Sequence, residues 1–338
     1  MFGYIVRRLV TFCITLFGIV ILTFMISHII PGDPAALAAG PTATRATVEA
    51  LREDMGLNKP LVTQFVDYLQ GITQLDFGRS IMSRRPVSED LLLYFPATLE
   101  LVIVAFMLYL LLGIPLGIIS ALARGRGVDI AIRFFSIVGY ATPLFVLALW
   151  LQYIFYYQLD LFPSGNRLPF LLQPPPRVTG FYLIDSLLVG DTKLFMTSLH
   201  HLVLPVISLS LTWLAIATRF TRASMLNELG KDYIKMARLK GLKPWQVVIR
   251  HALRNSLIPV ITMTSVQFGY FIGGSVLIEV VYLWPGVGTY AFNSTVSLDY
   301  APVMGVTLVT SFVFISVNLL VDLLYPVLDP RIKLTGAR

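Results

Sequence analysis

The residues best placed to do chemistry are basic and lie close together. Residues 231–260 read KDYIKMARLKGLKPWQVVIRHALRNSLIPV, with seven Lys or Arg side chains against a single acid, Asp232. Side chains of this kind attract anionic lipid or dock a protein partner. The chain carries no Walker A glycine loop, GxSxG, HExxH or paired-carboxylate site. The sequence therefore indicates binding rather than catalysis, and no enzyme activity is expected of this chain.

Three carboxylates lie at or near expected membrane depth: Glu100, Glu279 and Asp322, the last close to Asn318. Such groups could form a proton relay in a secondary transporter. Each, however, is near an expected interface or can hydrogen-bond within a helix bundle. We therefore expect structural roles for them and keep a proton-coupled carrier as an alternative.

Metal and redox chemistry have little support. His200 and His201 are adjacent, and neighbouring residues on a helix point about 100° apart, so they cannot form a chelate without other ligands. Cys13 is the only cysteine, which excludes an intrachain disulfide or a CxxC pair. Asp33 is expected to be a turn or capping residue. No metal or cofactor is expected to bind this chain.

The elements around the basic stretch have the composition of a membrane protein. Hydrophobic residues make up 56% of the 338 residues and charged residues only 13%, against about 25% charged in an ordinary soluble domain. The net charge of +7 could suit nucleic acid, but a soluble basic face would then be needed, and the apolar content leaves little room for one. Nucleic-acid binding is therefore not expected.

A helix needs about 20 apolar residues to cross a bilayer. Six stretches qualify, at about 9–30, 97–123, 134–157, 199–219, 257–283 and 303–328. The first resembles a secretory signal, because Arg7 and Arg8 precede it and PAALAAG at 34–40 offers a cleavage site. Its apolar core nevertheless exceeds the roughly 7 to 15 residues of a signal, which favours an uncleaved anchor. Residues 181–190 are too short to span, and we expect an interfacial or packed outer helix there.

Lys and Arg residues set the expected orientation. Nine of them lie between Arg219 and Arg254 alone, and an excess of basic residues marks cytoplasmic loops. The sequence therefore predicts an all-α integral membrane protein with six transmembrane helices and both termini in the cytoplasm. We expect an anchor and extracytoplasmic helical cap over 1–95, a core over 96–328 and a cytoplasmic tail over 329–338.

Within the cap, PGDP at 31–34 is expected to end the first helix, because proline cannot donate a backbone hydrogen bond. Val48, Leu51 and Met55 are spaced as on a helix that ends at Gly56. Pro60 can open a second helix, and a third short helix is expected between Pro86 and Phe95.

The segment at 220–256, called here the basic loop, is expected to contain two amphipathic helices that meet at Gly241, the second opening at Pro244. The predicted apolar faces are Leu226, Leu229, Tyr233, Met236 and Ala237 on the first helix, and Trp245, Val248, Ile249 and Ala252 on the second. Three interpretations compete with docking of a partner. The basic residues could hold the loop near anionic lipid, the helices could lie flat on the membrane, or they could only cover the protein's own spans.

Several motifs together resemble one family. Within the basic loop and just after it they are Asp232-Tyr233-Ile234, Ala237-x-x-x-Gly241, His251-Ala252-Leu253-Arg254-Asn255 and Pro259. Elsewhere they are Arg7-Arg8, PGDP at 31–34, DFGRS at 76–80, RRPV at 84–87, ATLEL at 97–101, WPGVG at 284–288 and VNLLVDLLYPVLDPRI at 317–332. Over nearly the whole chain, the pattern is similar to permease subunits of ATP-binding-cassette importers of the dipeptide, oligopeptide and nickel branch.

The resemblance implies that the basic loop is the EAA loop, whose coupling helix inserts into a groove on a cytoplasmic ATPase. Ala237 and Gly241 match the alanine and glycine of that motif, but Lys235 stands where the motif has Glu. The I-x-L-P ending is replaced by the 251–255 run leading to Pro259. The expected ATPase-coupling residues are Ala237, Gly241, Leu242, Lys243, Trp245, Gln246, Val248 and Arg254.

The resemblance also implies partners in the inner membrane and on both its sides. These are a second, similar permease, two cytoplasmic ATPases that bind ATP and Mg, and an extracytoplasmic substrate-binding protein. The expected cargo is a short peptide, with glutathione, oligosaccharide and nickel chelates as alternatives; TGFYLIDSLLVGD at 179–191 looks more like dipeptide permeases than nickel ones. The substrate-pathway residues stay open, as does a membrane scaffold without transport.

Overall fold

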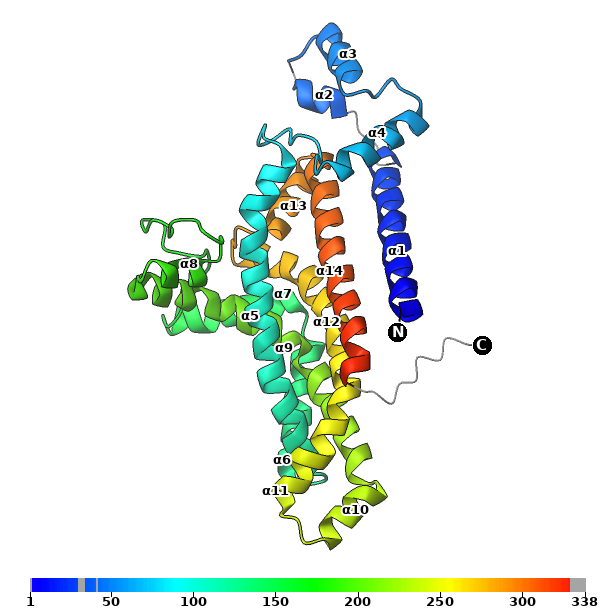
Figure 1. The fold of residues 1–338 in the computed structure, drawn as a ribbon. Helices are drawn as coiled ribbons and strands as arrows, with labels where there is room; N and C mark the ends of the chain where they lie inside the picture. The colour runs from blue at the N-terminus through cyan, green and yellow to red at the C-terminus, as the bar shows by residue number, and fades with distance from the viewer. Residues whose placement is uncertain (1, 30–33, 41, 329–338) are drawn as a thin grey trace. The chain divides into compact units, whose positions relative to one another are not determined.

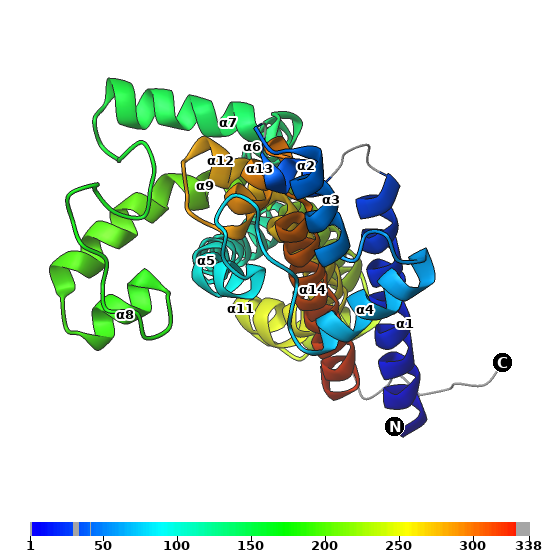
Figure 2. The ribbon, with the colours of Figure 1, turned by 90° about the horizontal axis from the view of Figure 1, so that it is seen from above.

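A computed structural model of the chain describes residues 2–29, 34–40 and 42–328. Over these residues the protein consists of helices, turns and one isolated bridge between Arg79 and Pro86, without strands. The fold divides into two compact units, Met1–Thr98 with Pro285–Ser316 (unit 1) and Leu99–Trp284 with Val317–Arg338 (unit 2). Figures 1 and 2 show the helices in two perpendicular views. The observed architecture is the all-α membrane fold that the sequence predicts.

Five helices of the described residues are long and apolar enough to cross a membrane. The candidate spans are Ile5–Ile26, Val87–Leu122, Thr192–Leu229, Pro259–Val281 and Tyr300–Leu323. A sixth is obtained if the bent pair Gly127–Ala141 and Leu144–Gln158 counts as one span. Five to six candidate spans therefore agree with the expected six, whereas the expected tail at 329–338 lies outside the described residues.

The expected third span, at about 134–157, is wrong as a single straight helix. The chain bends by 105° between α6 (Gly127–Ala141) and the helix pair α7 (Leu144–Leu151) and η1 (Gln152–Gln158), as can be followed in Figures 1 and 2. Thr142 has an extended backbone with ψ of 126°, as expected for a residue that precedes a proline. Pro143 then has no N–H with which to continue the helix.

Unit 1 contains the first helix and the helical cap. Its elements are α1 (Phe2–Ile29), α2 (Pro34–Ala39), α3 (Arg45–Asp54), α4 (Leu61–Thr73) and α13 (Val287–Val296), with the start of α5 (Val87–Leu122) and part of α14 (Tyr300–Leu328). The predicted cap helices are confirmed as α3 and α4, because Gly56 follows α3 with φ of +68° and Pro60 precedes α4. The predicted third cap helix is wrong as a separate element, since α5 starts at Val87 and continues through the second span.

Two buried carboxylates fix the turn between α4 and α5. Asp299 accepts hydrogen bonds from Ser80 Oγ at 2.7 Å and from the Met82 backbone N–H at 3.1 Å. Asp90 accepts from Ser83 Oγ at 2.6 Å and from Tyr290 Oη at 2.9 Å. Ser80 of the DFGRS motif therefore has a structural role in this turn, as does Arg85 of the RRPV motif, whose Nη2 lies 2.6 Å from Asp90 Oδ1. Asp33 lies outside the described residues.

Unit 2 is built around α9 (Thr192–Leu229), which packs against α6, α7 and α12 (Arg254–Val281), and against the short helix α8 (Tyr182–Leu188). Glycines let the second span approach α9 closely. A Cβ on Gly113 would lie 2.5 Å from Ala217 Cβ, and one on Gly117 would lie 2.5 Å from Thr221 Cβ. Small residues four apart allow backbones of membrane helices to come together in this way. α8 confirms that residues 181–190 form a helix too short to span.

Candidate functional site

The basic loop begins in the last turns of α9 and ends in the first residues of α12. Between them it contains α10 (Asp232–Leu239), α11 (Pro244–Gln246) and η2 (Val247–Leu253), a π-helix that continues into α12. The predicted first face is partly wrong: Leu226, Leu229 and Ala237 do pack into an apolar cluster, but Tyr233 and Met236 are exposed. The reason is that the helix does not run on from Leu226 to Ala237. It breaks at Gly230 and restarts at Asp232, which changes which residues face inward. Ile234 and Ala237 are buried, whereas Met236 is 55% exposed.

Gly241 forms the predicted corner between the two helical parts. Its φ is +76°, a left-handed conformation that costs little only for glycine. An added Cβ would meet nothing within 4 Å, so backbone conformation rather than space restricts the position. The Gly241 N–H donates to the Arg238 carbonyl at 3.0 Å, which closes the end of α10.

The second helical part begins at Pro244, as predicted. The Lys243 backbone N–H donates to Gln246 Oε1 at 3.1 Å, so Gln246 caps the first turn. The predicted second face is partly wrong, because Trp245 and Ile249 are 52% and 54% exposed. Val247 is buried in their place, since the π-helical turn changes the register at which side chains return to the same face.

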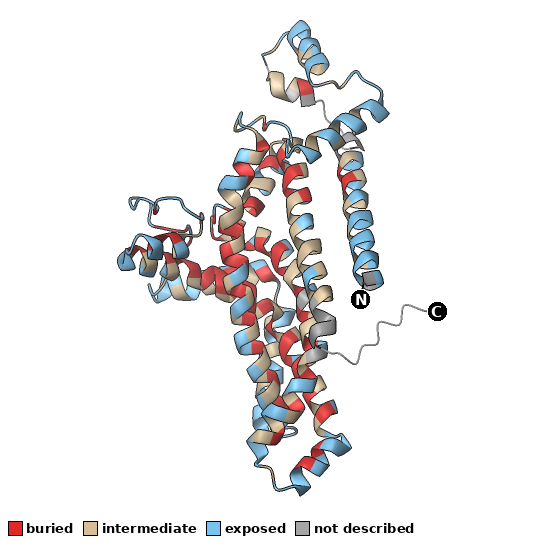
Figure 3. Ribbon diagram, in the orientation of Figure 1, coloured by how far each residue is buried: buried red, intermediate tan, exposed pale blue. Residues whose placement is uncertain are grey.

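The inner side of the basic loop is attached to the spans of unit 2. Its buried residues form an apolar cluster with the ends of α5 and α9; the members are Ala121, Met225, Ile234, Ala237, Val247 and Ala252, with Leu242, Val248 and Leu253 packed against them. Own-span packing, one of the competing interpretations, therefore accounts for one side of each helix. Figure 3 shows the alternation of buried and exposed residues along this part of the chain.

The outer side of the basic loop is apolar as well as basic. Met236, Leu239, Trp245 and Ile249 are 55%, 81%, 52% and 54% exposed. The exposed cations on the same elements are Lys235, Arg238, Lys240, Lys243 and Arg250. The Arg250 guanidinium lies 5.9 Å from the Trp245 ring centroid, within the range of a cation–π contact. We call these nine residues the outer loop surface.

The eight predicted coupling residues divide between the two sides. Ala237 is buried, and Leu242 and Val248 pack on the inner cluster. Gly241, Lys243, Trp245 and Arg254 are exposed, and Gln246 is half-buried at the first turn of α11. The sequence interpretation missed Leu239, the most exposed apolar side chain of the loop, although its position two residues before Gly241 was a signal for the corner. A role in ATPase coupling stays a prediction for all eight.

A polar cluster joins the two ends of the basic loop. Tyr233 Oη donates to Glu228 at 2.6 Å and accepts from Asn255 Nδ2 at 2.9 Å, while Lys231 Nζ lies 2.5 Å from Glu228. Glu228 raises the pKa of Lys231. Burial, followed by the bond to Glu228, raises the pKa of Tyr233. The last residues of α9, the start of α10 and the start of α12 are therefore held together, and Lys235 pairs separately with Asp232 at 2.8 Å.

A second charged cluster fixes the start of α6 to α9. Arg222 donates two hydrogen bonds to Asp129, from Nε and Nη2, each 2.8 Å long. Asp129 also accepts from Ser120 Oγ at 2.6 Å and from the Gly125 N–H at 3.0 Å. Two parallel bonds between arginine and carboxylate are the strong form of this pair. Because these residues are far apart in sequence, spacing alone could not have indicated the cluster.

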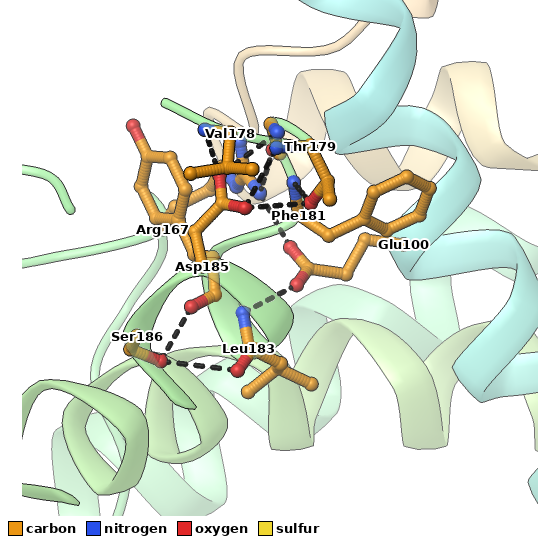
Figure 4. Close-up of polar contacts among 10 residues, drawn as sticks. Glu100, Arg167, Val178, Thr179, Phe181, Leu183, Asp185 and Ser186 are labelled. Atoms are coloured by element: carbon orange, nitrogen blue, oxygen red, sulfur yellow. Dashed lines mark hydrogen bonds and ion pairs between the residues drawn. The ribbon is translucent and has the colours of Figure 1, made fainter. Parts of the chain in front are cut away.

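Glu100 belongs to a buried ion pair of unit 2, close to α8 (Figure 4). Arg167 Nη2 lies 2.5 Å from Glu100 Oε2, with both side chains at most 7% exposed. Glu100 also accepts the Leu183 N–H at 2.8 Å, and the Arg167 guanidinium lies 3.4 Å from the Tyr182 ring centroid. These contacts support the structural role expected for Glu100.

Asp185 organises the loop that precedes α8 (Figure 4). It accepts hydrogen bonds from the backbone N–H groups of Val178, Thr179 and Gly180, and from the Thr179 hydroxyl at 2.7 Å. Burial alone would raise the pKa of Asp185, but these bonds outweigh it and hold the pKa below its usual value. Asp185 therefore fixes the conformation of the first residues of the TGFYLIDSLLVGD segment.

The remaining candidate residues have structural partners. His200 Nε2 donates to the Leu161 carbonyl at 2.7 Å, and His201 Nδ1 to the Gly165 carbonyl at 2.9 Å. Glu279 is fully buried and accepts from Ser275 Oγ at 3.3 Å. Both histidines thus connect the segment between η1 and α8 to α9.

Comparison with known proteins gives the class to which this arrangement belongs. Residues 113–334 match the family described as "Binding-protein-dependent transport system inner membrane component". Residues 1–102 match the family described as its N-terminal membrane component. The chain belongs to the binding-protein-dependent transport system inner membrane components, the permease subunits of importers, and is a multi-pass inner membrane protein.

Relatives match along nearly the whole chain. The protein named "Probable D,D-dipeptide transport system permease protein DdpB", from Escherichia coli strain K12, is 47% identical over 94% of each chain. The dipeptide transport system permease protein DppB of Alkalihalophilus pseudofirmus is 38% identical, over 98% of this chain and 100% of its own. The glutathione transport system permease protein GsiC of Pectobacterium atrosepticum is 36% identical, over 98% and 99%.

A solved structure of the MetNI methionine transporter in an inward-facing conformation aligns with 69% of this chain and 93% of its own, at a TM-score of 0.48 and 13% identity.

Proposed function

We propose that this chain is the permease subunit of an ATP-driven importer that moves short peptides across the inner membrane by alternating access. The membership of the permease family and the full-length similarity to dipeptide permeases support this function. The similarity to a glutathione permease makes glutathione a second candidate cargo. Oligosaccharides and nickel chelates are weaker alternatives, since the relatives described above are named for peptides and glutathione.

In this proposal the outer loop surface binds an ATPase subunit. Solvent-exposed aromatic and aliphatic side chains within a ring of cations are unusual on a polar loop, and central aromatic anchors with a charged rim are typical of protein interfaces. The inner side of the loop is already occupied by the apolar cluster. A partner is therefore needed only for the outer side, where Trp245 is 52% exposed.

The remaining partners follow from the same class of transporter. A second, similar permease would complete the transport pathway, two ATPases would bind ATP and Mg beneath the membrane, and an extracytoplasmic binding protein would deliver the cargo. The chain itself would hold no cofactor. A proton-coupled carrier is the weaker candidate, because the ion pair to Arg167 leaves Glu100 without the solvent access that a relay needs.

Trp245→Ala tests the coupling surface. Loss of a central aromatic anchor typically costs about 2 kcal/mol or more of binding energy, so we expect the ATPase chains to be lost when the tagged permease is purified from gently solubilised membranes. Peptide uptake should fall with them. The amount of permease in the membrane should be unchanged, because Trp245 contributes nothing to the inner cluster.

Phe170→Ala is the matched control, because it also removes an exposed aromatic ring, 101% exposed, from an outer loop of unit 2. Copurification of the ATPases should survive it. Retention of the ATPases by Trp245→Ala would contradict the coupling role. Recovery of the wild-type chain without any ATPase would contradict the importer itself and return the basic loop to the lipid surface.

A further inference from the structure

A cavity of about 360 Å³ lies between α6 and α9 in unit 2. This volume is within the usual range for small-molecule sites. The lining includes three arginines, Arg133, Arg219 and Arg222, together with Ser136, Tyr140 and Ile216. None of these six belongs to the outer loop surface, so the cavity is a separate feature of the molecule.

The cavity is positively charged. Arg222 is neutralised by its two bonds to Asp129. Arg133 and Arg219 are exposed and form no ion pair with any residue in the described ranges; Arg219 only approaches the neighbouring Phe220 ring, at 6.0 Å. Two guanidinium charges are therefore available to an anion, and arginine forks suit the geometry of phosphate oxygens.

The surroundings of the cavity are apolar. Ile137, Ala215, Thr218 and Ala223 complete its lining, and of these four only Thr218 is polar. On the same helix as Arg133, the side chains of Phe134, Phe135 and Ile137 are 61%, 73% and 61% exposed. An occupant with an anionic group and hydrocarbon chains would satisfy both parts of this surface, whereas a small hydrophilic anion would satisfy only the arginines.

We infer that this cavity binds the phosphate headgroup of an anionic phospholipid. Arg133 and Arg219 bind the phosphate, the hydroxyls of Ser136 and Tyr140 can donate to its oxygens or to the glycerol, and the acyl chains lie along the exposed apolar face of α6. The cavity is formed by residues 133–140 in the second half of α6 and by residues 215–223 of α9, where the basic loop begins. Basic pockets of this kind between membrane helices favour anionic lipid.

The double variant Arg133→Gln with Arg219→Gln tests this inference without touching the Asp129–Arg222 pair. The full chain, with the subunits that copurify, is reconstituted in nanodiscs with equal amounts of phosphatidylglycerol and phosphatidylethanolamine, then released into detergent for native mass spectrometry. Wild-type protein should retain phosphatidylglycerol in preference to phosphatidylethanolamine. The double variant should lose that preference roughly thirtyfold, as expected from removal of two basic side chains at a headgroup.

The matched control is Arg124→Gln with Arg126→Gln, which removes the same charge from exposed positions just before α6. It should retain the wild-type preference. An equal loss in this control would overturn the inference, because the effect would then be one of diffuse surface charge. Equal retention of the two lipids by the wild type would overturn it too.

Two further outcomes identify other occupants, and both contradict the inference. Displacement of the retained lipid by a millimolar dipeptide would assign the cavity to a cargo carboxylate. Loss of a second permease chain from the double variant, with lipid retention unchanged, would assign it to a subunit interface. ATPase copurification should be the same in all variants, so failure here is distinguishable from failure of the coupling surface.

Discussion

At the scale of single residues, two buried carboxylates of unit 2 pair with arginines that are far away in the sequence. Glu100 and Arg167 are 67 residues apart, and Asp129 and Arg222 are 93 apart. A buried ion pair contributes little net stability over apolar residues of similar volume, but removing one partner leaves an unpaired charge that is costly. Replacing one partner of such a pair should therefore lower the free energy of unfolding much more than replacing both.

For Arg167→Met, we expect a loss of about 3 to 5 kcal/mol in the free energy of unfolding, because Glu100 is left buried without its cation. The double variant Glu100→Gln with Arg167→Met should recover much of this loss, since the glutamine keeps an acceptor for the Leu183 N–H. Thermal melting of the purified variants in detergent measures both effects. Equal melting temperatures for the single and double variants would show that the pair acts only through packing.

At the scale of elements, two glycines of α5 set the distance to α9. A Cβ on Gly117 would lie 2.8 Å from the Thr218 carbonyl oxygen and 2.5 Å from Thr221 Cβ. By contrast, a Cβ on Gly273 of α12 would meet nothing within 4 Å. Alanine should thus be destabilising at Gly117 of α5 but not at Gly273 of α12.

Gly117→Ala should destabilise the chain by about 1 to 3 kcal/mol, the usual cost of overpacking, and reduce its amount in the membrane. Gly273→Ala should leave it unchanged or slightly higher, because alanine is the better helix former. Melting temperature and expression of the two variants, compared side by side, provide the measurement. Similar losses for both would mean that glycine at these positions serves another purpose than close packing.

The elements also show what sequence patterns can and cannot predict. The Gly241 corner, the start at Pro244 and the helices α3, α4 and α8 were readable, because glycine and proline limit the backbone locally. Thr142-Pro143 carried the signal for the bend after α6, which apolar length alone concealed. The break at Gly230 was missed because a single glycine is compatible with a continuing helix, and this misplaced Tyr233 and Met236. The ion pairs and the arginine cavity depend on tertiary packing and left no local signal.

At the scale of the whole molecule, the expected topology places the basic loop in the cytoplasm and the segment with Leu171 outside. The side of the membrane on which each of these two segments lies can be tested in a Cys13→Ser background, which removes the only native thiol. Leu239 and Leu171 are 81% and 95% exposed. A cysteine at either position should therefore be accessible to a reagent on its own side once peripheral proteins, including any ATPase on the outer loop surface, are stripped from the vesicles.

A membrane-impermeant maleimide should label Leu239→Cys only in inside-out vesicles and Leu171→Cys only in right-side-out vesicles. The expected contrast follows from the concentration of Lys and Arg in the basic loop, since such loops stay in the cytoplasm. Labelling after detergent permeabilisation is the control for thiol reactivity. The reverse pattern would invert the topology. Labelling of both cysteines from the same side would contradict the single span that is expected between them.

The attachment of the basic loop to its own spans has a mechanical consequence. Ala237, Val247 and Ala252 are nearly or fully buried against Ala121 of α5 and Met225 of α9, and close-packed interiors have low compressibility. The loop is therefore rigidly attached to these two helices. A force on Trp245 would be transmitted to α5 and α9 with little deformation of the loop. The displacement of these helices would therefore follow the displacement of a partner bound at that side chain.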